Sequence, residues 1–472
     1  MDKNKLNPLV LKMSKDLMRA KPTMGLGLAC NAVHFKMANI ASQLRLKVDV
    51  GAGFGSAVSN FYGLSLSNSG SGKSVGVTLL DSFYFSSAFE YIKEVVFPKY
   101  KEIAEKKLEK AGIERALHSW TSKLGTATHS GLYANSETYY LCKFGSINIQ
   151  LDELGDAITG KKELFEILLE CYNNGDFPAV AKRSDSDALD IDGISVNFYT
   201  FGDPDKLTAG DSVESAFQAL LKQGYARRFI FSQDEESELK IRTPQEVVKE
   251  MQETEQIKKD RAIDRENIKS LISSENMNKT LSLTSEAMLE FAVIQCDGEN
   301  FVRENKGLDE AVVSDLLNRT FKTTKLASIY AFFDGSDVVT KEHMIQAFEI
   351  VKESSKVLSR ITVVKQKHER LLEAMLKESK PCTTQHLLSY PFIPSSWTKR
   401  IDEYVDLAKQ LASEQGLIWK TTLRKGIDYH QVTKKNKTIE KVLDEVDAKE
   451  VKETIAVKKK MTEEELLAFL EN

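Results

Sequence analysis

The sequence predicts an α/β protein: a core with a mainly parallel sheet, then an all-helical region and a small C-terminal winged-helix-like domain. Three observations lead to this fold class. A short apolar run leads into a glycine-rich turn and then a helix within residues 61–80. A second apolar run, at 146–155, ends in adjacent acidic residues about 80 residues after that turn. Helices near the C-terminus are followed by two alternating strands at 417–432, which favours a separate small domain.

Composition and charge limit the possible functions. The chain has 472 residues, enough for roughly two to four domains. Its 42% apolar and 28% charged residues are typical of a soluble globular protein. The formal net charge of −4 predicts no strongly basic surface, so any nucleic-acid contact would come from local patches. We expect no signal peptide and no membrane span, and therefore a cytoplasmic protein.

The cysteines predict neither disulfides nor a metal site. They are spread along the chain without a CxxC pair, as Cys30, Cys142, Cys171, Cys296 and Cys382. Their odd number and wide spacing favour reduced thiols over a disulfide framework, and we expect no zinc site.

Changes in composition and periodicity divide the chain into six segments. We expect an N-terminal helical extension at 1–60, an α/β core at 61–233, a charged helical linker at 234–282, a helical domain at 283–365, a winged-helix-like domain at 366–435 and a charged tail with a terminal amphipathic helix at 436–472. In the first segment His34 lies on an apolar helix, where a core histidine is more common than a ligand.

Residues 61–80, FYGLSLSNSGSGKSVGVTLL, contain the parts of a phosphate-binding P-loop. The glycines allow backbone conformations that a Cβ would forbid, so that successive N–H groups can face phosphate oxygens. The helix that follows adds its positive N-terminal end. Lys73 would neutralise the β- and γ-phosphates of ATP, and the Ser74 hydroxyl would bind Mg²⁺. The predicted nucleotide-binding residues are Ser69, Gly70, Ser71, Gly72, Lys73, Ser74 and Val75.

The match departs from the usual G-x-x-x-x-G-K-S/T pattern at one position, because Ser67 stands where the pattern has glycine. The G-S-G-K-S part is intact. The alternative is a flexible Gly/Ser turn that contains a lysine by chance, and the flanking strand and helix disfavour it.

The apolar run at 146–155 ends in Asp152 and Glu153, which is the form of a Walker B motif. We expect this strand beside the P-loop strand in a parallel sheet, with its carboxylates at the edge where ligands bind. Asp152 would hold Mg²⁺, directly or through water. Glu153 would orient and deprotonate the attacking water as general base. Many strands end in acidic residues, so the motif is informative because it follows a P-loop.

Two further groups of residues are candidates for sensing or stabilising the γ-phosphate. Thr200 and Asn197 lie on the next expected strand, at 194–204, and are either γ-phosphate sensors or ordinary strand residues. Arg227 and Arg228 stand directly before a short strand. Arginines stabilise transferring phosphoryl charge as fingers from a neighbouring subunit, although a surface pair or contacts to DNA phosphates remain alternatives.

The helix expected at 316–333 has a strongly apolar face. Arg319, Lys322 and Lys325 follow one another at three-residue spacing along one side of it. That side is either solvated or faces phosphate, and we favour the solvated interpretation.

The C-terminal hairpin gives the segment before it the form of a winged helix, a DNA-docking variant of the helix-turn-helix. Lys420, Arg424 and Lys425 would form a basic wing that meets DNA phosphates. A plain protein contact is the alternative. The tail ends in an acidic amphipathic helix at 461–470, which is either a partner-binding segment or a solvated helix.

The chain resembles P-loop ATPases of bacteriophages and mobile elements, which are often the helicase half of primase-helicases. The resemblance covers about residues 25–356 and rests on LSNSGSGKS, SINIQLDELG, SVNFYTFGDP, QGYARRFIF and LNRTFKTTKLASIYAFFDGSDVVTKEHM. It implies a RecA-like or AAA-like P-loop NTPase core, a hexameric ring and a role in DNA replication. No primase residues are present, so no priming activity is expected.

The resulting expectation is an ATP-dependent DNA helicase or translocase of phage replication, acting with ATP and Mg²⁺ on single-stranded or forked DNA in the host cytoplasm. ATP would lie between subunits of a homo-oligomer, and the tail would bind a replication protein. The alternatives are an ATP-switched replication initiator or helicase loader, and an ATPase subunit of a phage defence or packaging complex.

Overall fold

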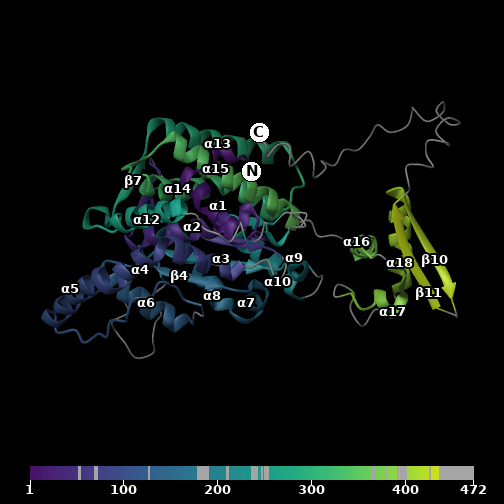
Figure 1. The fold of residues 1–472 in the computed structure, drawn as a ribbon, viewed down its shortest axis with the longest axis horizontal. Helices are drawn as coiled ribbons and strands as arrows, with labels where there is room; N and C mark the ends of the chain where they lie inside the picture. The colour runs from purple at the N-terminus through teal and green to yellow at the C-terminus, as the bar shows by residue number, and fades with distance from the viewer. Residues whose placement is uncertain are drawn as a thin grey trace. The chain divides into compact units, whose positions relative to one another are not determined.

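The structure is a computed structural model of the chain. It describes residues 1–51, 55–67, 73–125, 128–177, 191–208, 212–234, 243–245, 248, 255–362, 367–378, 380–390, 393, 401–424 and 427–434. These residues form two compact units, both drawn in Figure 1. The first comprises residues 1–207 and 216–362, and the second comprises 208–215 and 363–434.

The centre of the first unit is a four-stranded, fully parallel sheet in the order β4-β5-β3-β6. Its strands are β3 (Tyr62–Leu66), β4 (Ile147–Leu151), β5 (Val196–Gly202) and β6 (Ile230–Gln233). Every residue of β3, β4 and β5 is buried, as expected for a parallel sheet that is covered on both faces. The predicted α/β class with a parallel sheet is confirmed.

The lateral order of the strands differs from the sequence prediction. We expected the strand that ends in Asp152 beside the strand that precedes the glycine-rich turn, but β5 lies between β4 and β3. In register, Thr200 of β5 is opposite both Leu64 and Leu151. The chain therefore skips one position after β3 and returns to fill it. Local sequence patterns identify strands but carry no information on which strands become neighbours.

Helix α2 (Leu26–Gln43) lies in the interior of this unit rather than at its margin. Residues 28–43 are all buried, and the helix packs on β3, β5 and β6. Its other neighbours are α1 (Pro8–Ala20), α3 (Lys73–Leu80) and α14 (Glu310–Phe333). Such all-round burial explains the Gly/Ala-rich apolar sequence of α2.

Helices fill the connections between the parallel strands. Between β3 and β4 the chain forms α3, α4 (Ser86–Tyr91), α5 (Phe97–Lys110) and α6 (His129–Cys142), with π-helical turns at Asp81–Phe85 and Ile92–Val96. Between β4 and β5 lie α7 (Leu154–Gly160) and α8 (Lys162–Asn174). Between β5 and β6 lie α9 (Pro204–Leu207), α10 (Ser212–Leu220) and a π-helical turn at Leu221–Tyr225.

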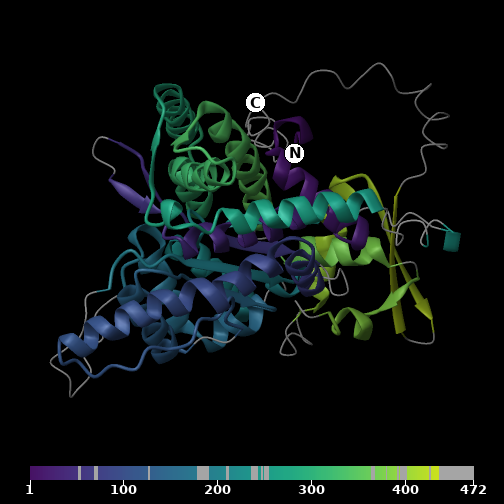
Figure 2. The ribbon, with the colours of Figure 1, turned by 60° about the vertical axis from the view of Figure 1, so that its left-hand side comes forward.

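A second, mixed sheet in the order β2-β1-β7-β8 joins distant parts of the first unit. It contains β1 (Lys47–Asp49), β2 (Ser56–Val58), β7 (Thr280–Leu283) and β8 (Val338–Val339). Helix α12 (Glu255–Ser270) precedes β7 in the chain, and α13 (Ser285–Glu304), α14 and α15 (Lys341–Thr362) lie side by side in Figures 1 and 2. Thr284 caps α13, because its hydroxyl accepts a hydrogen bond from the Ala287 N–H.

The second unit has its own core and sheet. Its elements are α16 (Lys367–Lys377), β9 (Cys382–Thr383), α17 (Thr384–Leu387), α18 (Ile401–Glu414), β10 (Leu417–Arg424) and β11 (Ile427–Lys434). The strands are antiparallel in the order β10-β11-β9, so the predicted terminal hairpin is present. Leu372, Val405 and Val432 are among the buried residues that join the helices to the sheet.

Candidate functional site

Polar side chains gather where the parallel strands end. Because all four strands run in one direction, the residues that follow them share one edge of the sheet. They are Ser67 after β3, Asp152 and Glu153 after β4, Asp203 after β5 and Asp234 after β6. Ligands bind at this edge in open α/β sheets, so the fold places the candidate site here.

The central contact of this edge joins two predicted Mg²⁺ ligands. The Ser74 hydroxyl, in the first turn of α3, donates to Asp152 Oδ1 at 3.1 Å, and both residues are exposed. They lie 78 residues apart in the chain. A hydroxyl and a carboxylate are hard oxygen donors of the type that Mg²⁺ prefers, so this pair fits that ion.

Glu153 lies next to this pair at the start of α7. Its backbone is extended, with φ −146° and ψ 121°, and its side chain does not cap the helix. Its Oε1 atom is buried and has no hydrogen-bond partner among the described residues. Burying an unpaired carboxylate oxygen is costly, so such an atom suggests a ligand or water as its partner.

The predicted loop itself lies mostly outside the described residues, which include none of Ser69, Gly70, Ser71 and Gly72. Lys73 is the first residue of α3, and Val75, in the same turn, is 49% exposed. The predictions for the loop residues therefore stay predictions.

The residue that begins the loop is held by two other elements. The Ser67 hydroxyl donates to Asp234 Oδ2 at 3.1 Å, and Asp234 Oδ1 accepts the Gly25 N–H at 2.9 Å. Gly25 is the N-cap of α2, so one carboxylate joins the end of β3, the end of β6 and the start of α2. Ser67, which departs from the usual glycine, has a structural contact that glycine could not make.

The two candidate sensors lie at different levels of β5. Asn197 is near the amino end, where it accepts the Phe61 N–H at 2.9 Å and donates to Ser42 Oγ at 2.6 Å. It lies opposite Asn148, four residues before Asp152 and about 13 Å from the edge at the usual strand rise. We therefore do not carry Asn197 forward as a sensor. Thr200 is buried one register step before Asp152 and remains the candidate.

The two candidate arginines also differ in exposure. Arg228 is 8% exposed and donates to the carbonyls of Gly224 at 2.9 Å and Leu169 at 3.2 Å. Its guanidinium also lies 5.6 Å from the centre of the Tyr172 ring. Arg227 is exposed. Because Arg228 is held within its own chain, Arg227 is the one of the two predicted fingers that the surface exposes.

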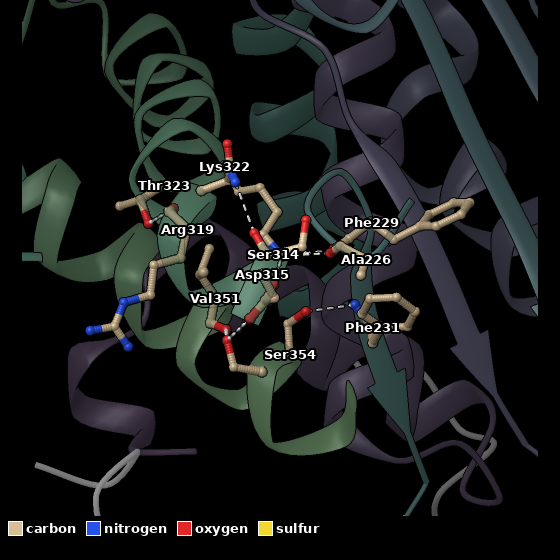
Figure 3. A network of polar contacts seen from close by, with 12 residues as sticks. Ala226, Phe229, Phe231, Ser314, Asp315, Arg319, Lys322, Thr323, Val351 and Ser354 are labelled. Carbon is tan, nitrogen blue, oxygen red and sulfur yellow. Dashed lines mark hydrogen bonds and ion pairs between the residues drawn. The ribbon is translucent and has the colours of Figure 1, made fainter. Parts of the chain in front are cut away.

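The three basic residues of α14 are buried, so the predicted solvated face is wrong. Arg319, Lys322 and Lys325 are each no more than 3% exposed. Figure 3 shows the ammonium of Lys322 directed at Asp315, with which it forms an ion pair, and at the Phe229 carbonyl, 3.0 Å away. Asp315 lies on the same helix, but the carbonyl acceptors of Lys322 and Lys325 come from distant segments, which is why three-residue spacing alone could not reveal the burial.

Lys325 is unusual because the groups that accept hydrogen bonds from its ammonium carry no charge. Its ammonium donates to the carbonyls of Val58 at 2.9 Å and Tyr172 at 2.5 Å, and to Asn60 Oδ1 at 2.8 Å. Burial, together with the positive charge of Arg228, lowers the pKa of Lys325 well below its ordinary value.

His34 is a core histidine, as the sequence predicts. Its Nε2 atom lies 2.7 Å from the Tyr330 hydroxyl, and the residue is fully buried. Burial lowers the pKa of His34 to about 3, so the ring is neutral at physiological pH.

The second unit does not show a basic surface on the helix before its hairpin. The exposed residues of α18 are Asp402, Glu403, Asp406, Leu407, Gln410, Ser413 and Glu414. Lys409 is half-buried and pairs with Asp406 at 3.0 Å. Of the predicted wing residues, Lys420 is exposed on β10, the side chain of Arg424 is not described, and Lys425 lies outside the described residues.

Comparison with known proteins does not assign a family. No protein-family model matches the chain, and no curated protein matches it significantly. The resemblance to phage ATPases therefore stays a prediction. None of the described helices combines the length and the apolar character that crossing a bilayer requires.

Proposed function

We propose that this chain is a P-loop ATPase that hydrolyses ATP with Mg²⁺. The observation that carries the proposal is the hydrogen bond between Ser74 and Asp152. The two residues belong to separate motifs 78 residues apart in the chain, and they meet at the edge of the sheet where ligands bind. The strand order reverses beside β3, which is the usual place for a binding crevice in an open α/β sheet.

The residues of the proposed site have separate roles in the reaction. The loop N–H groups and Lys73 hold the phosphates, while Ser74 and Asp152 hold Mg²⁺. The ion would neutralise charge on the β- and γ-phosphates. Glu153 accepts a proton from the water that attacks the γ-phosphate, and Thr200 contacts that phosphate or water. Arg227 of a neighbouring subunit stabilises the charge that develops on the transferred group.

ATP hydrolysis by the purified full chain tests this proposal. Lys73→Ala should remove phosphate binding and hydrolysis, and Glu153→Gln should bind ATP but turn over at least about 100-fold more slowly. Exposed residues of neighbouring helices provide matched controls, Lys99→Ala on α5 and Glu163→Gln on α8. Wild-type turnover by Glu153→Gln would remove Glu153 as the base, and wild-type turnover by Lys73→Ala would reject the ATPase site.

We further propose that the ATPase acts on DNA as an oligomeric ring, most simply a hexamer, as a helicase or translocase of replication. The exposure of Arg227 supports an ATP site shared between subunits. We expect single-stranded DNA to stimulate ATP hydrolysis, and we expect this stimulation to weaken as the salt concentration rises. We also expect the protein to unwind a forked DNA substrate.

One observation favours a second candidate, an ATP-switched initiator or helicase loader. The helix of the winged-helix-like unit that would enter the major groove exposes carboxylates, which DNA phosphates repel. Such a surface suits a protein partner better than DNA. Slow hydrolysis that DNA does not stimulate, with no unwinding of a forked substrate, would support this candidate over the helicase.

A further inference from the structure

Three side chains of the second unit bring together groups that commonly bind metals. Glu378 follows α16, Cys382 lies on β9 and His386 lies on α17. One ligand atom from each lies within 4.8 Å of the other two. Their spacing, E-x-x-x-C-x-x-x-H, lacks the CxxC pair on which the sequence prediction depended, so the sequence predicted no zinc site.

We propose that Glu378, Cys382 and His386 bind one Zn²⁺ ion. Thiolate, imidazole and carboxylate are the three protein ligand types of zinc, and a soft thiolate disfavours Mg²⁺ and Ca²⁺. Three protein ligands leave a fourth position for water or another ligand. The site is separate from the proposed ATP site, which has no sulfur ligand.

The observed distances approach those of a tetrahedral site. With zinc bonds of about 2.0–2.1 Å to N and O, two such ligands lie about 3.3 Å apart. His386 Nε2 is 3.2 Å from Glu378 Oε1. With a Zn–S bond of about 2.3 Å, the sulfur should lie about 3.6 Å from each of the other two ligands. Because the three ligand atoms lie within 4.8 Å of one another, Cys382 Sγ needs to approach each of the other two by at most about 1.2 Å.

The surrounding contacts orient these ligands. Cys382 is buried and pairs in register with His430 of β11, so its position is fixed by the sheet. The Thr383 hydroxyl accepts the His386 N–H and thereby caps α17. The Tyr390 hydroxyl donates to Glu378 Oε1 at 3.0 Å, and its ring packs edge-on against His386 with 5.5 Å between ring centres. Outer contacts of this kind hold ligands in place in metal sites.

An ion at this position would join three elements of a small unit. The end of α16, β9 and α17 would be linked through one centre, which stabilises small domains with limited cores. The side chains of His386 and Glu378 are 47% and 34% exposed, so the ion has an entry path from solvent.

Co²⁺ binding to the reduced full chain tests the proposal. A cobalt–thiolate charge-transfer band should appear, saturate at one Co²⁺ per chain and disappear when Zn²⁺ is added. Cys382→Ser should abolish the band, whereas Cys296→Ser, which changes an exposed cysteine on α13, should retain it. Absence of the band in the wild type, or its persistence in Cys382→Ser, would overturn the proposal.

Zinc affinity and folding provide a second readout. His386→Gln and Glu378→Gln should each weaken Zn²⁺ binding, and Tyr390→Phe should weaken it by roughly 10-fold. Circular dichroism should show each variant folded. ATP hydrolysis should be unchanged in Cys382→Ser, so failure of the metal site and failure of the ATPase proposal are distinguishable. If His386→Gln, Glu378→Gln and Tyr390→Phe all bound Zn²⁺ as tightly as the wild type, the ion would bind elsewhere.

Discussion

Buried charges of α14 show how single residues couple distant parts of the first unit. Lys322 pairs with Asp315 on its own helix and also reaches the carbonyl of Phe229, just before β6. Asp315 in turn accepts the Ser355 hydroxyl of α15 at 2.5 Å. Removing one member of such a pair leaves the other charge buried without compensation.

We expect Asp315→Asn to destabilise the protein by about 3–5 kcal/mol, because Lys322 would lose its anionic partner in the interior. Denaturant unfolding measures the change. Glu102→Gln on α5 removes an exposed pair with Lys106 and should leave stability almost unchanged, because solvent screens that pair. Similar small effects of both substitutions would contradict the burial of the α14 charges.

Lys325 should make stability depend on alkaline pH. Its pKa is lowered in the folded state, so between the folded pKa and the unfolded value near 10.4 the unfolded chain binds more protons. The free energy of unfolding should therefore rise with pH in that window, by up to about 1.4 kcal/mol per pH unit.

Urea unfolding at several pH values, with wild type compared with Lys325→Met, isolates this contribution. The free energy of unfolding should rise less steeply with pH in Lys325→Met than in the wild type. Lys99→Met should keep the wild-type slope, since Lys99 is exposed. Parallel pH profiles for the wild type and Lys325→Met would show that the ammonium does not titrate in this window.

At the scale of elements, the charge of α18 decides what the second unit can contact. Four of its exposed residues are acidic, and the apolar Leu407 is 45% exposed. The neighbouring hairpin exposes Ile418 and Leu423, at 46% and 69%. An acidic helix beside apolar strands favours a protein surface over a phosphate backbone.

Replacing Asp402 and Asp406 with lysine reverses the charge of this surface and should therefore create affinity for DNA. The double variant should bind duplex DNA more tightly than the wild type at low salt. The slope of log K against log salt concentration should steepen by about one unit for each new phosphate contact. Lys420→Ala in the wild-type background should have little effect. A large loss of DNA binding in Lys420→Ala would instead support the basic wing.

Element identities were predictable where the signals are local. The strand before the glycine-rich turn, the strand ending in Asp152 and the C-terminal hairpin are all present. The insertion of β5 between β3 and β4 was not predictable, because lateral strand order depends on contacts across the whole core. The burial of Lys322 and Lys325 was missed for the same reason. Their acceptors are supplied by segments remote in sequence.

At the scale of the whole molecule, the proposed site would be complete only in an assembly. Ser74, Asp152 and Glu153 come from one chain, whereas Arg227 is exposed and would serve a neighbouring chain. Because the site residues would come from two chains, mixing variants can test the assembly without imaging a ring.

Mixing Lys73→Ala and Arg227→Ala chains should restore ATP hydrolysis that neither shows alone. In a randomly mixed ring about a quarter of the sites would combine an intact Lys73 with an intact neighbouring Arg227. Hydrolysis is measured before and after mixing, with Lys99→Ala replacing one variant as a control. No recovery, with both variants assembled normally, would place the arginine in the same chain or outside the reaction.

The burial of α2 has a practical consequence for dissecting this protein. A shortened chain beginning at residue 61, where the first predicted strand starts, would lose the helix that covers β3, β5 and β6. It would also lose Gly25, one of the partners of Asp234 at the base of the loop. Such a fragment would expose a bare sheet face and aggregate. Biochemical work on the nucleotide site therefore has to retain the first 60 residues.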